Sequence, residues 1–334
     1  MMIKNLKILL AISLGFLVIS LGMYFDDNSS KSNLPSESLI PTFDDILKQI
    51  AYIEFSNNEG KSVIEDVNGN WLITTANDFP ANTELLSRFF IQLREAKISE
   101  TKTSRSDLHY KLGLDEANKM RFILKSASGQ IIYDLDIGTY NYDIPGTYIK
   151  NSGESQSYLV TTNLSADVSD FYWTPTDLIN FGKAQIQSIQ IYNKNMINLV
   201  SEGEVLSHQN LPEGFSKLSE DKINEIHSSL TDVQHNGFIL RTDLPNSPNF
   251  KVRYSLKNGT VLFISFYDIS GEGVYVTLDW NYLNNDIEIS KFIDPILDGS
   301  QLQLSSVSLL PRFAYKVPQL LFDNNNLKLR AKSE

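Results

Sequence analysis

Residues 120–137 read MRFILKSASGQIIYDLDI, and this stretch predicts two neighbouring β-strands joined by a tight turn. Met120–Ser126 and Gln130–Ile137 are rich in side chains that favour strands, and Gly129 between them is typical of a turn. Such a hairpin cannot bury its own apolar side chains. We therefore expect an antiparallel sheet that continues on either side of it.

The preceding segments extend this pattern. Ala51–Ser56 and Ser62–Asp66 are short and strand-forming, and Trp71–Thr74 follows the pair Asn68-Gly69. Asn-Gly favours a two-residue hairpin turn because both of its positions tolerate positive φ. The sequence thus predicts three further strands in meander order.

A helix is expected after Pro80, with Asn82 as its N-cap. Its apolar residues recur at helical spacing and form one face: Leu85, Leu86, Phe89, Phe90 and Leu93. We expect this face to lie against the sheet.

Beyond the helix, Gly113 is expected to end a short helix, and Thr147–Lys150 and Ser157–Val160 have the composition of strands. Leu164–Asp170 is interpreted as a short helical piece. It leads into three consecutive aromatic residues, Phe171, Tyr172 and Trp173.

The order of elements recurs in the second half of the chain. Ile186–Ile191 is similar in pattern to Ile50–Phe55, and Ser219 is a good N-cap for a second helix with Ile223, Ile226 and Leu230 on its apolar face. The remaining matches are Lys251–Leu256 and Thr260–Tyr267 with the first hairpin, Gly273–Leu278 with Gly146–Lys150, and Phe313–Pro318 with Phe171–Pro175. These correspondences favour an internal repeat. The alternative is that an ordinary α+β chain happens to repeat this order.

Residues 8–25 contain no charged side chain and would span roughly 27 Å as a helix, close to the hydrocarbon thickness of a bilayer. Lys4 and Lys7 precede them and Asp26 and Asp27 follow, which orients the N-terminus toward the cytoplasm. We expect a retained membrane anchor. The alternative is a signal peptide that is cleaved after Ser20-Leu21-Gly22.

Composition limits the function further. The net charge is -11, so nucleic acid is not an expected partner, and the absence of cysteine excludes disulfides and thiolate metal sites. The expected divisions are an anchor at 1–25, a flexible tether at 26–45, a first α+β unit at 46–185 and a second, divergent unit at 186–334.

Several motifs together resemble a bacterial family called domain of unknown function 4340. They are GNWLIT, FPANTELLSRFFIQLREAKI, LHYKLGLDEA, MRFILKSASGQIIYDLDIG, GTYIK and SYLV. The resemblance implies a membrane-anchored periplasmic protein that is an auxiliary part of an ABC-type export system, including those related to gliding motility. The family has no established catalytic residues to transfer. In the second half, Val205-Leu206-Ser207 takes the place of Trp71.

Candidate catalytic groups have simpler interpretations. Asp134 and Asp136 lie two apart on a predicted strand and project to one face, where paired carboxylates could act as acid and base. Charged residues on the exposed face of a strand are the more common reason for such spacing. The four histidines, His109, His208, His227 and His235, lack the helical spacing of a zinc site.

Two aromatic groups are the candidate partner or ligand surface. The first is Phe171, Tyr172 and Trp173, because three consecutive aromatic residues on a strand cannot all enter one core; a seam between the repeats is the alternative. The second is Tyr140, Tyr142 and Tyr148 around Pro145-Gly146, which could instead be a loop stiffened by its own rings.

We therefore predict an α+β protein with two similar units behind one N-terminal transmembrane helix. Each unit is an antiparallel sheet with a helix packed on one face. The predicted function is a non-catalytic periplasmic scaffold or accessory subunit of an ABC-type export assembly, with no cofactor and no metal. Its expected partners are the inner membrane and an ABC-type permease or another envelope protein. The alternative is a binding module for a glycan, lipid or peptide.

Overall fold

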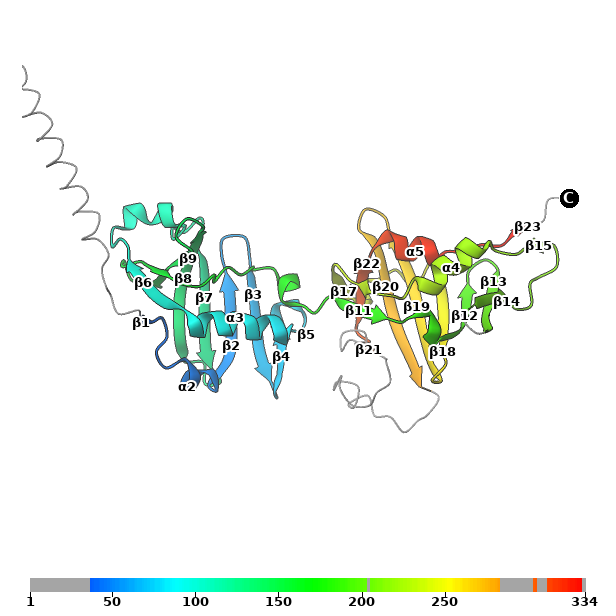
Figure 1. Cartoon of the computed structure of the whole chain (residues 1–334), viewed down its shortest axis with the longest axis horizontal. Coiled ribbons are helices and arrows are strands. Elements are labelled where there is room, and N and C mark those ends of the chain that lie inside the picture. Colours follow the sequence, from blue (N-terminus) through cyan, green and yellow to red (C-terminus); the bar gives the residue numbers. More distant parts are fainter. Residues whose placement is uncertain (1–36, 203–204, 283–302, 305–310, 332–334) are drawn as a thin grey trace, which may run out of the picture. The chain divides into compact units, whose positions relative to one another are not determined.

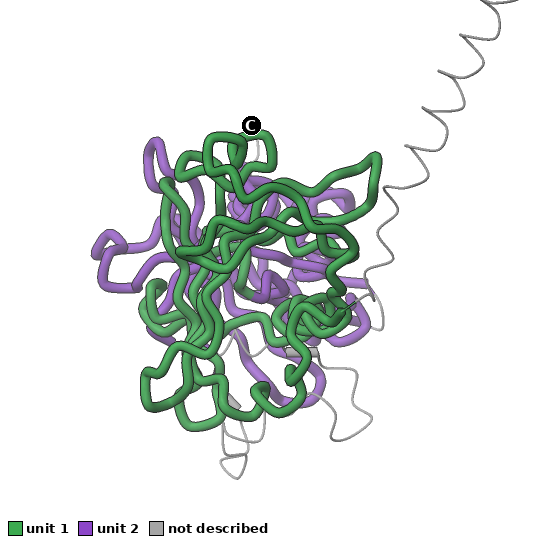
Figure 2. The backbone as a smooth tube through the Cα atoms, turned by 90° about the vertical axis from the view of Figure 1, so that its left-hand side faces the viewer, with its two compact units in different colours: residues 1–174 green, residues 175–334 purple. Residues whose placement is uncertain are grey.

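The computed structural model describes residues 37–202, 205–282, 303–304 and 311–331, and these form a sheet-rich α+β protein. The chain divides into two compact units between Thr174 and Pro175, which are coloured separately in Figure 2. The sequence placed this boundary later, after Gln185. We describe each unit by itself.

Unit 1 is built on a sheet with one long helix and one short helix. Its strands are β1 (Glu37–Ser38), β2 (Ile50–Ser56), β3 (Lys61–Val67), β4 (Asn70–Ile73), β5 (Phe79–Pro80), β6 (Lys97–Thr101), β7 (Met120–Ser126), β8 (Ile131–Asn141), β9 (Gly146–Asn151) and β10 (Tyr158–Val160). Its helices are α2 (Phe43–Leu47) and α3 (Thr83–Glu95), with 3₁₀ turns at Thr74–Ala76, Ser106–Leu112 and Asp170–Trp173.

The ten strands of unit 1 form one antiparallel sheet in the order β1-β6-β10-β9-β8-β7-β2-β3-β4-β5 (Figure 1). The hairpin predicted at residues 120–137 lies near its centre, with Phe122 opposite Leu135. Helix α3 packs on one face: the Phe89 ring lies 5.2 Å from that of Phe55 and 5.3 Å from that of Phe122.

Unit 2 has more, shorter elements. Its strands are β11 (Asp177–Asn180), β12 (Ile186–Tyr192), β13 (Met196–Glu202), β14 (Val205–His208), β15 (Phe215–Ser216), β16 (Val233–Gln234), β17 (Phe238–Leu240), β18 (Phe250–Leu256), β19 (Thr260–Ile269), β20 (Gly273–Tyr282), β21 (Gln303–Leu304), β22 (Phe313–Val317) and β23 (Arg330–Ala331). Its helices are α4 (Glu220–Ser228) and α5 (Gln319–Asn325), with 3₁₀ turns at Lys183–Gln185 and Arg241–Asp243.

The main sheet of unit 2 has the order β14-β13-β12-β18-β19-β20-β22-β17. Unit 1 read in the same direction gives β4-β3-β2-β7-β8-β9-β10-β6, which are the same elements counted along each chain segment. The helix between the third and fourth of these strands in sequence is α3 in unit 1 and α4 in unit 2. The two sheets therefore share one order of equivalent strands, and β14 stands where β4 stands.

Local signals in the sequence correspond to observed geometry. Asn68 and Gly69 both have positive φ in the hairpin turn between β3 and β4. The Asn82 side chain accepts a hydrogen bond from the Leu85 backbone and caps α3, and Ser219 caps α4 in the same way through the backbone N–H of Lys222.

Two predictions about the segments after the last strands are wrong. Leu164–Asp170 is not helical, and the helical turn lies at Asp170–Trp173 instead. Phe313–Val317 is not the counterpart of the Phe171 segment; it is strand β22, which occupies the place of β10 in the sheet. Each stretch places a large ring in a core, Trp173 in one and Tyr315 in the other, so their similar composition did not distinguish a 3₁₀ turn from a strand.

The predicted anchor at residues 8–25 lies outside the described residues, as does most of the predicted tether. Within the ranges that the structure describes, no helix is long and apolar enough to cross a membrane.

Candidate binding surfaces

Helix α3 directs its apolar residues in two directions. Leu86, Phe89 and Leu93 are buried against the sheet, as their spacing predicts. Phe90 and Ile91 lie on the flank of the same helix, and Ile91 is 50% exposed. The flank therefore presents apolar surface that the core of unit 1 does not use.

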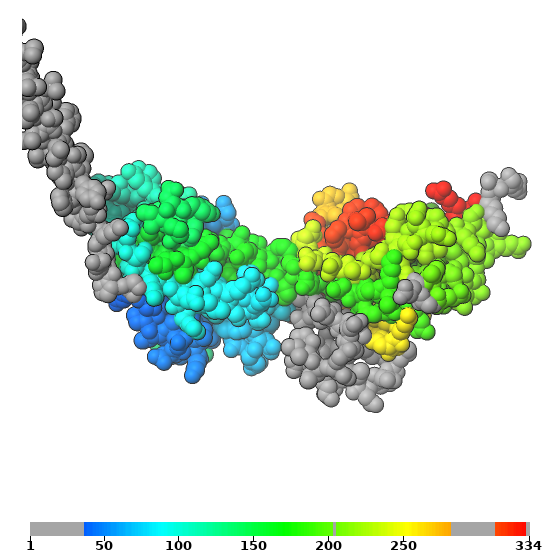
Figure 3. Space-filling view, in the orientation of Figure 1, coloured from blue at the N-terminus to red at the C-terminus, as the bar shows by residue number. Residues whose placement is uncertain are grey.

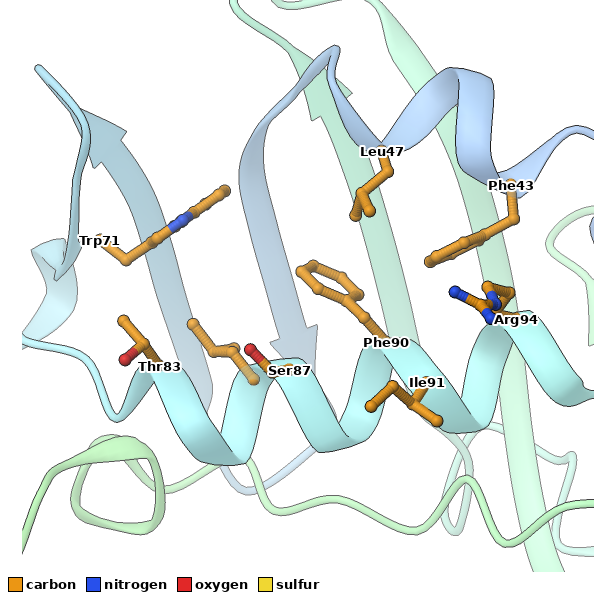
Figure 4. A pocket seen from close by; sticks show the side chains of 9 residues that line it. Phe43, Leu47, Trp71, Thr83, Ser87, Phe90, Ile91 and Arg94 are labelled. Atoms are coloured by element: carbon orange, nitrogen blue, oxygen red, sulfur yellow. The ribbon is translucent and has the colours of Figure 1, made fainter.

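A groove lies between this flank and helix α2. It encloses about 370 Å³ and we call it the α2–α3 groove; it is lined by Phe43, Leu47, Trp71, Thr83, Leu86, Ser87, Phe90, Ile91 and Arg94. Figure 3 shows the blue and cyan surfaces of this part of unit 1 side by side. In Figure 4, Trp71 stands at one end of the groove and Arg94 at the other, beside Phe43.

The groove is hydrophobic with one cationic end. Leu47 is 41% exposed and Trp71 is half-buried, while the Phe43 and Phe90 rings lie 6.1 Å apart. The Arg94 guanidinium lies 3.9 Å from the Asp44 carboxylate, too far for a hydrogen bond, and both side chains are mostly exposed. No pattern in the sequence predicted the α2–α3 groove. The signal that could have found it is the pair Phe43 and Leu47, four residues apart in a segment assigned mainly to the tether.

The first predicted aromatic surface is divided by the structure. Trp173 is fully buried, and its ring stacks on Phe55 at 4.3 Å and meets Phe89 edge-on at 6.1 Å. Its Nε1–H donates to the Asp167 carbonyl at 2.9 Å, and its own carbonyl accepts from the Asn82 backbone at 2.6 Å. Trp173 is therefore a core residue of unit 1 rather than part of a partner surface.

The neighbours of Trp173 lie further out. Tyr172 is 40% exposed and packs edge-on against Trp173, while Phe171 is half-buried. The expectation that three consecutive aromatic residues cannot share one core is met, but by a 3₁₀ turn and not by a strand. A helical turn rotates successive side chains away from one another, so one ring enters the core while the next faces solvent.

The second aromatic group lies around the turn between β8 and β9. Tyr142 is 85% exposed and meets Tyr140 edge-on at 4.9 Å. Tyr148 is held differently: its hydroxyl accepts a hydrogen bond of 2.7 Å from the Asn141 amide. The structure therefore brings Tyr140 and Tyr142 into contact, with Tyr142 as the more exposed ring, while Tyr148 is bonded to Asn141 instead.

The two predicted carboxylates belong to separate ion pairs on the face of the sheet away from α3. Arg121 donates two hydrogen bonds to Asp134, at 2.9 and 2.7 Å, and lowers the pKa of that carboxyl. Asp136 is fully buried between the ammonium groups of Lys150 at 2.5 Å and Lys119 at 3.1 Å. Each carboxylate is thus committed to cations of the neighbouring strands or loop.

The histidines are also held by backbone groups. The rings of His109 and His227 contact the carbonyls of Ser155 and Lys183, at 2.9 and 3.1 Å. His208 Nε2 accepts from the Leu218 backbone, and His235 lies between two backbone carbonyls. Across the described parts of the chain, no group of three or more His, Asp or Glu residues could hold a metal ion.

The family model described as Domain of unknown function (DUF4340) matches residues 71–259, which is more than half of the chain. This range begins at Trp71 in the α2–α3 groove and ends at the turn after β18. A search of curated proteins finds no match.

Proposed function

The chain belongs to the DUF4340 family, a domain of unknown function, and on that premise we propose that it is a non-catalytic accessory subunit of an ABC-type export assembly. Residues 8–25 anchor it in the bacterial inner membrane with the N-terminus in the cytoplasm. Both folded units then face the periplasm. The partner is a permease or another envelope protein of the same membrane.

The non-catalytic role is supported by the contacts of the two candidate catalytic carboxylates. Asp134 is paired with Arg121, and Asp136 is buried between two lysines. A general base must reach the proton that it abstracts, and a fully buried carboxylate that holds two ammonium groups does not. These contacts favour a structural role for the charges.

In this proposal, the membrane anchor promotes assembly of the subunit with its partner. A tether confines the two units to a thin layer above the membrane, and this raises their effective concentration toward a membrane partner. Modest contacts are then enough for assembly. The cysteine-free composition is compatible with this location because the fold needs no disulfide.

The test is in-cell photocrosslinking of the full chain. A photoreactive residue is placed at Tyr142, Ile91 or Tyr172, which are exposed in the described structure. We expect adducts with an integral membrane protein at one of these positions. A matched chain, in which residues 1–25 are replaced by a cleavable signal peptide, should lose most of the adduct. Equal adducts from the released chain would overturn the anchored scaffold.

The second candidate function is a binding module for a glycan, lipid or peptide. Tyr142 favours it, because an 85% exposed ring next to Tyr140 offers a flat face for stacking on a sugar or a peptide side chain. Tyr142→Ala should abolish saturable binding of solubilised envelope glycan by the full chain. Unchanged binding would exclude this loop as the site.

A further inference from the structure

We propose that the α2–α3 groove binds one acyl chain of an anionic membrane lipid, with Arg94 holding the head group. The source of this lipid rests on the proposed anchoring of the chain in the membrane. The groove itself is a property of unit 1 and stands on the geometry described above.

The size of the groove limits its occupant. About 370 Å³ is at the lower end of the range for small-molecule sites, roughly 300–1,000 Å³. A helix with side chains is about 10 Å across and would need a longer and wider surface than this. A single extended chain fits the lining better than a docked helix.

The chemistry of the lining favours hydrocarbon over peptide. Six lining residues are apolar: Phe43, Leu47, Trp71, Leu86, Phe90 and Ile91. A peptide backbone buried there would need hydrogen-bond partners, and the backbone groups of α3 are already paired within the helix. The only lining hydroxyls are those of Thr83 and Ser87, on one side. An acyl chain has no polar groups that would need hydrogen-bond partners in the groove.

Arg94, the one charged residue in the lining, favours an anionic head group. Arg94 lies at the end beside Phe43, and its 3.9 Å contact with Asp44 leaves the guanidinium donors open to solvent. A guanidinium binds carboxylate or phosphate through two parallel hydrogen bonds. A lipid with its chain along the apolar lining would place its head group at this end.

Chain length places the groove within reach of the bilayer. Residues 26–36 separate the apolar segment from β1, and even fully extended they span no more than about 40 Å. Helix α2 begins only a few residues after β1. Unit 1 is therefore the unit that the tether joins directly.

The equivalent position of the helix carries a different kind of residue in unit 2. Counted from the N-caps Asn82 and Ser219, His227 of α4 takes the position of Phe90. His227 is buried and bonded to the Lys183 carbonyl of the preceding 3₁₀ turn. The apolar ring at this position of the helix is therefore particular to unit 1.

Photolabelling tests this proposal. The full chain, reconstituted in phosphatidylcholine vesicles, is irradiated with a diazirine-bearing fatty acid, and labelled peptides are identified by mass spectrometry. We expect label on peptides that contain Leu47 and Phe90. Ile91→Asp should reduce it at least tenfold, and Ser87→Trp, which fills the groove, should do the same. Ile131→Asp is the matched control, since Ile131 is exposed on β8 and should leave labelling unchanged.

The head-group contact has its own test. Arg94→Gln should reduce labelling by the fatty acid about tenfold, the size expected for a charged hydrogen bond, and leave labelling by the matching fatty alcohol unchanged. Label confined to residues 1–36, or label that persists in Ile91→Asp and Ser87→Trp, would overturn the proposal. Equal loss of both probes in Arg94→Gln would overturn the role of Arg94. None of these outcomes depends on whether a permease is captured by crosslinking.

Discussion

The two units share a strand order but complete their cores differently. In unit 1, the chain that follows β10 delivers one ring, Trp173, onto Phe55 of the sheet. In unit 2, the chain that follows β22 forms helix α5, whose Phe322 packs on Phe250 at 5.1 Å. The segment after the last strand is therefore free to vary in form as long as it supplies a large apolar group.

The interiors also differ in polar content. Unit 1 buries a carboxylate, Asp136, with two lysines on the face away from α3. Unit 2 buries a neutral group, because the Tyr254 hydroxyl bonds to Asn325 of α5 and to Ser229 at the end of α4. Burial raises the pKa of Tyr254, so this phenol stays neutral. The same order of strands therefore accommodates a buried ion pair in one unit and buried neutral hydrogen-bonding groups in the other.

The largest expected effect comes from removing the ring that completes unit 1. Trp173→Ala should cost up to about 5 kcal/mol of unfolding free energy in that unit, because the cavity would border Phe55 and Phe89. Hydrogen exchange should show β2 and β7 opening while β18 and β19 stay protected. Phe322→Ala is the matched variant and should show the opposite pattern. Equal loss in both units from either variant would mean that they do not unfold separately.

The buried charge of unit 1 gives the next largest effect. Asp136→Asn should cost about 3 kcal/mol, since it leaves the buried ammonium of Lys150 without its counter-charge, while Lys119 keeps only Glu116. Asp134→Asn is the control and should cost no more than about 1 kcal/mol, because Arg121 remains partly exposed. Urea denaturation of both variants measures the difference. Similar costs for the two would contradict the structural role assigned to Asp136.

The comparison predicts a pH dependence that belongs mainly to unit 2. Burial lowers the pKa of His208, His227 and His235. Because the unfolded chain binds these protons at higher pH, their contribution to stability is complete above about pH 6.5 and is lost as the pH falls through the folded pKa values. Asp134 in unit 1, with its lowered pKa, loses its contribution only below about pH 4.

Hydrogen exchange at pH 7 and pH 5.5 checks this prediction. Protection of β18 and β19 should fall between these values, while β7 and β8 serve as the internal reference. His227→Asn should reduce the change, because it removes one of the three titrating groups. A larger loss in β7 and β8 than in β18 would contradict the assignment.

The smallest effect on stability is expected at the exposed aromatic loop. Tyr142→Ala should change the unfolding free energy by less than about 0.5 kcal/mol, because the ring contacts little besides Tyr140. Thermal denaturation should therefore be unchanged. A destabilisation of more than 1 kcal/mol would show that the ring belongs to the fold rather than to a binding surface.

Local signals were enough to predict much of the fold. Asn68-Gly69, the caps Asn82 and Ser219, and the stop at Gly113 act through neighbouring residues, so their conformations can be inferred from a short window. The central hairpin at residues 120–137 is of this kind. In the second half, such signals predicted β12, α4, β18, β19 and β20, but they did not predict β13 or β17.

The core and the groove depend on contacts between distant residues. Trp173 stacks on Phe55, which is far from it in sequence, so this contact cannot be inferred from a short window. The adjacent residues Phe171 and Tyr172 favoured a surface position instead. The groove needs Phe43, Trp71 and Phe90 from three different elements. The spacing of apolar residues within one segment cannot predict a contact between three segments. Helix α2 has only five residues, so its sequence was not recognised as helical within the predicted tether.

The position of Trp173 has a consequence for the folding of the chain during its synthesis. It lies next to the last residue of unit 1, and it is the largest of the fully buried side chains. A chain that emerges N-terminus first from a ribosome cannot complete the core of unit 1 until residue 173 has come through. A nascent chain that stops a few residues earlier would leave the site beside Phe55 unfilled and exposed to chaperones and proteases. Unit 1 is therefore complete only when Trp173 has been synthesised and has packed on Phe55.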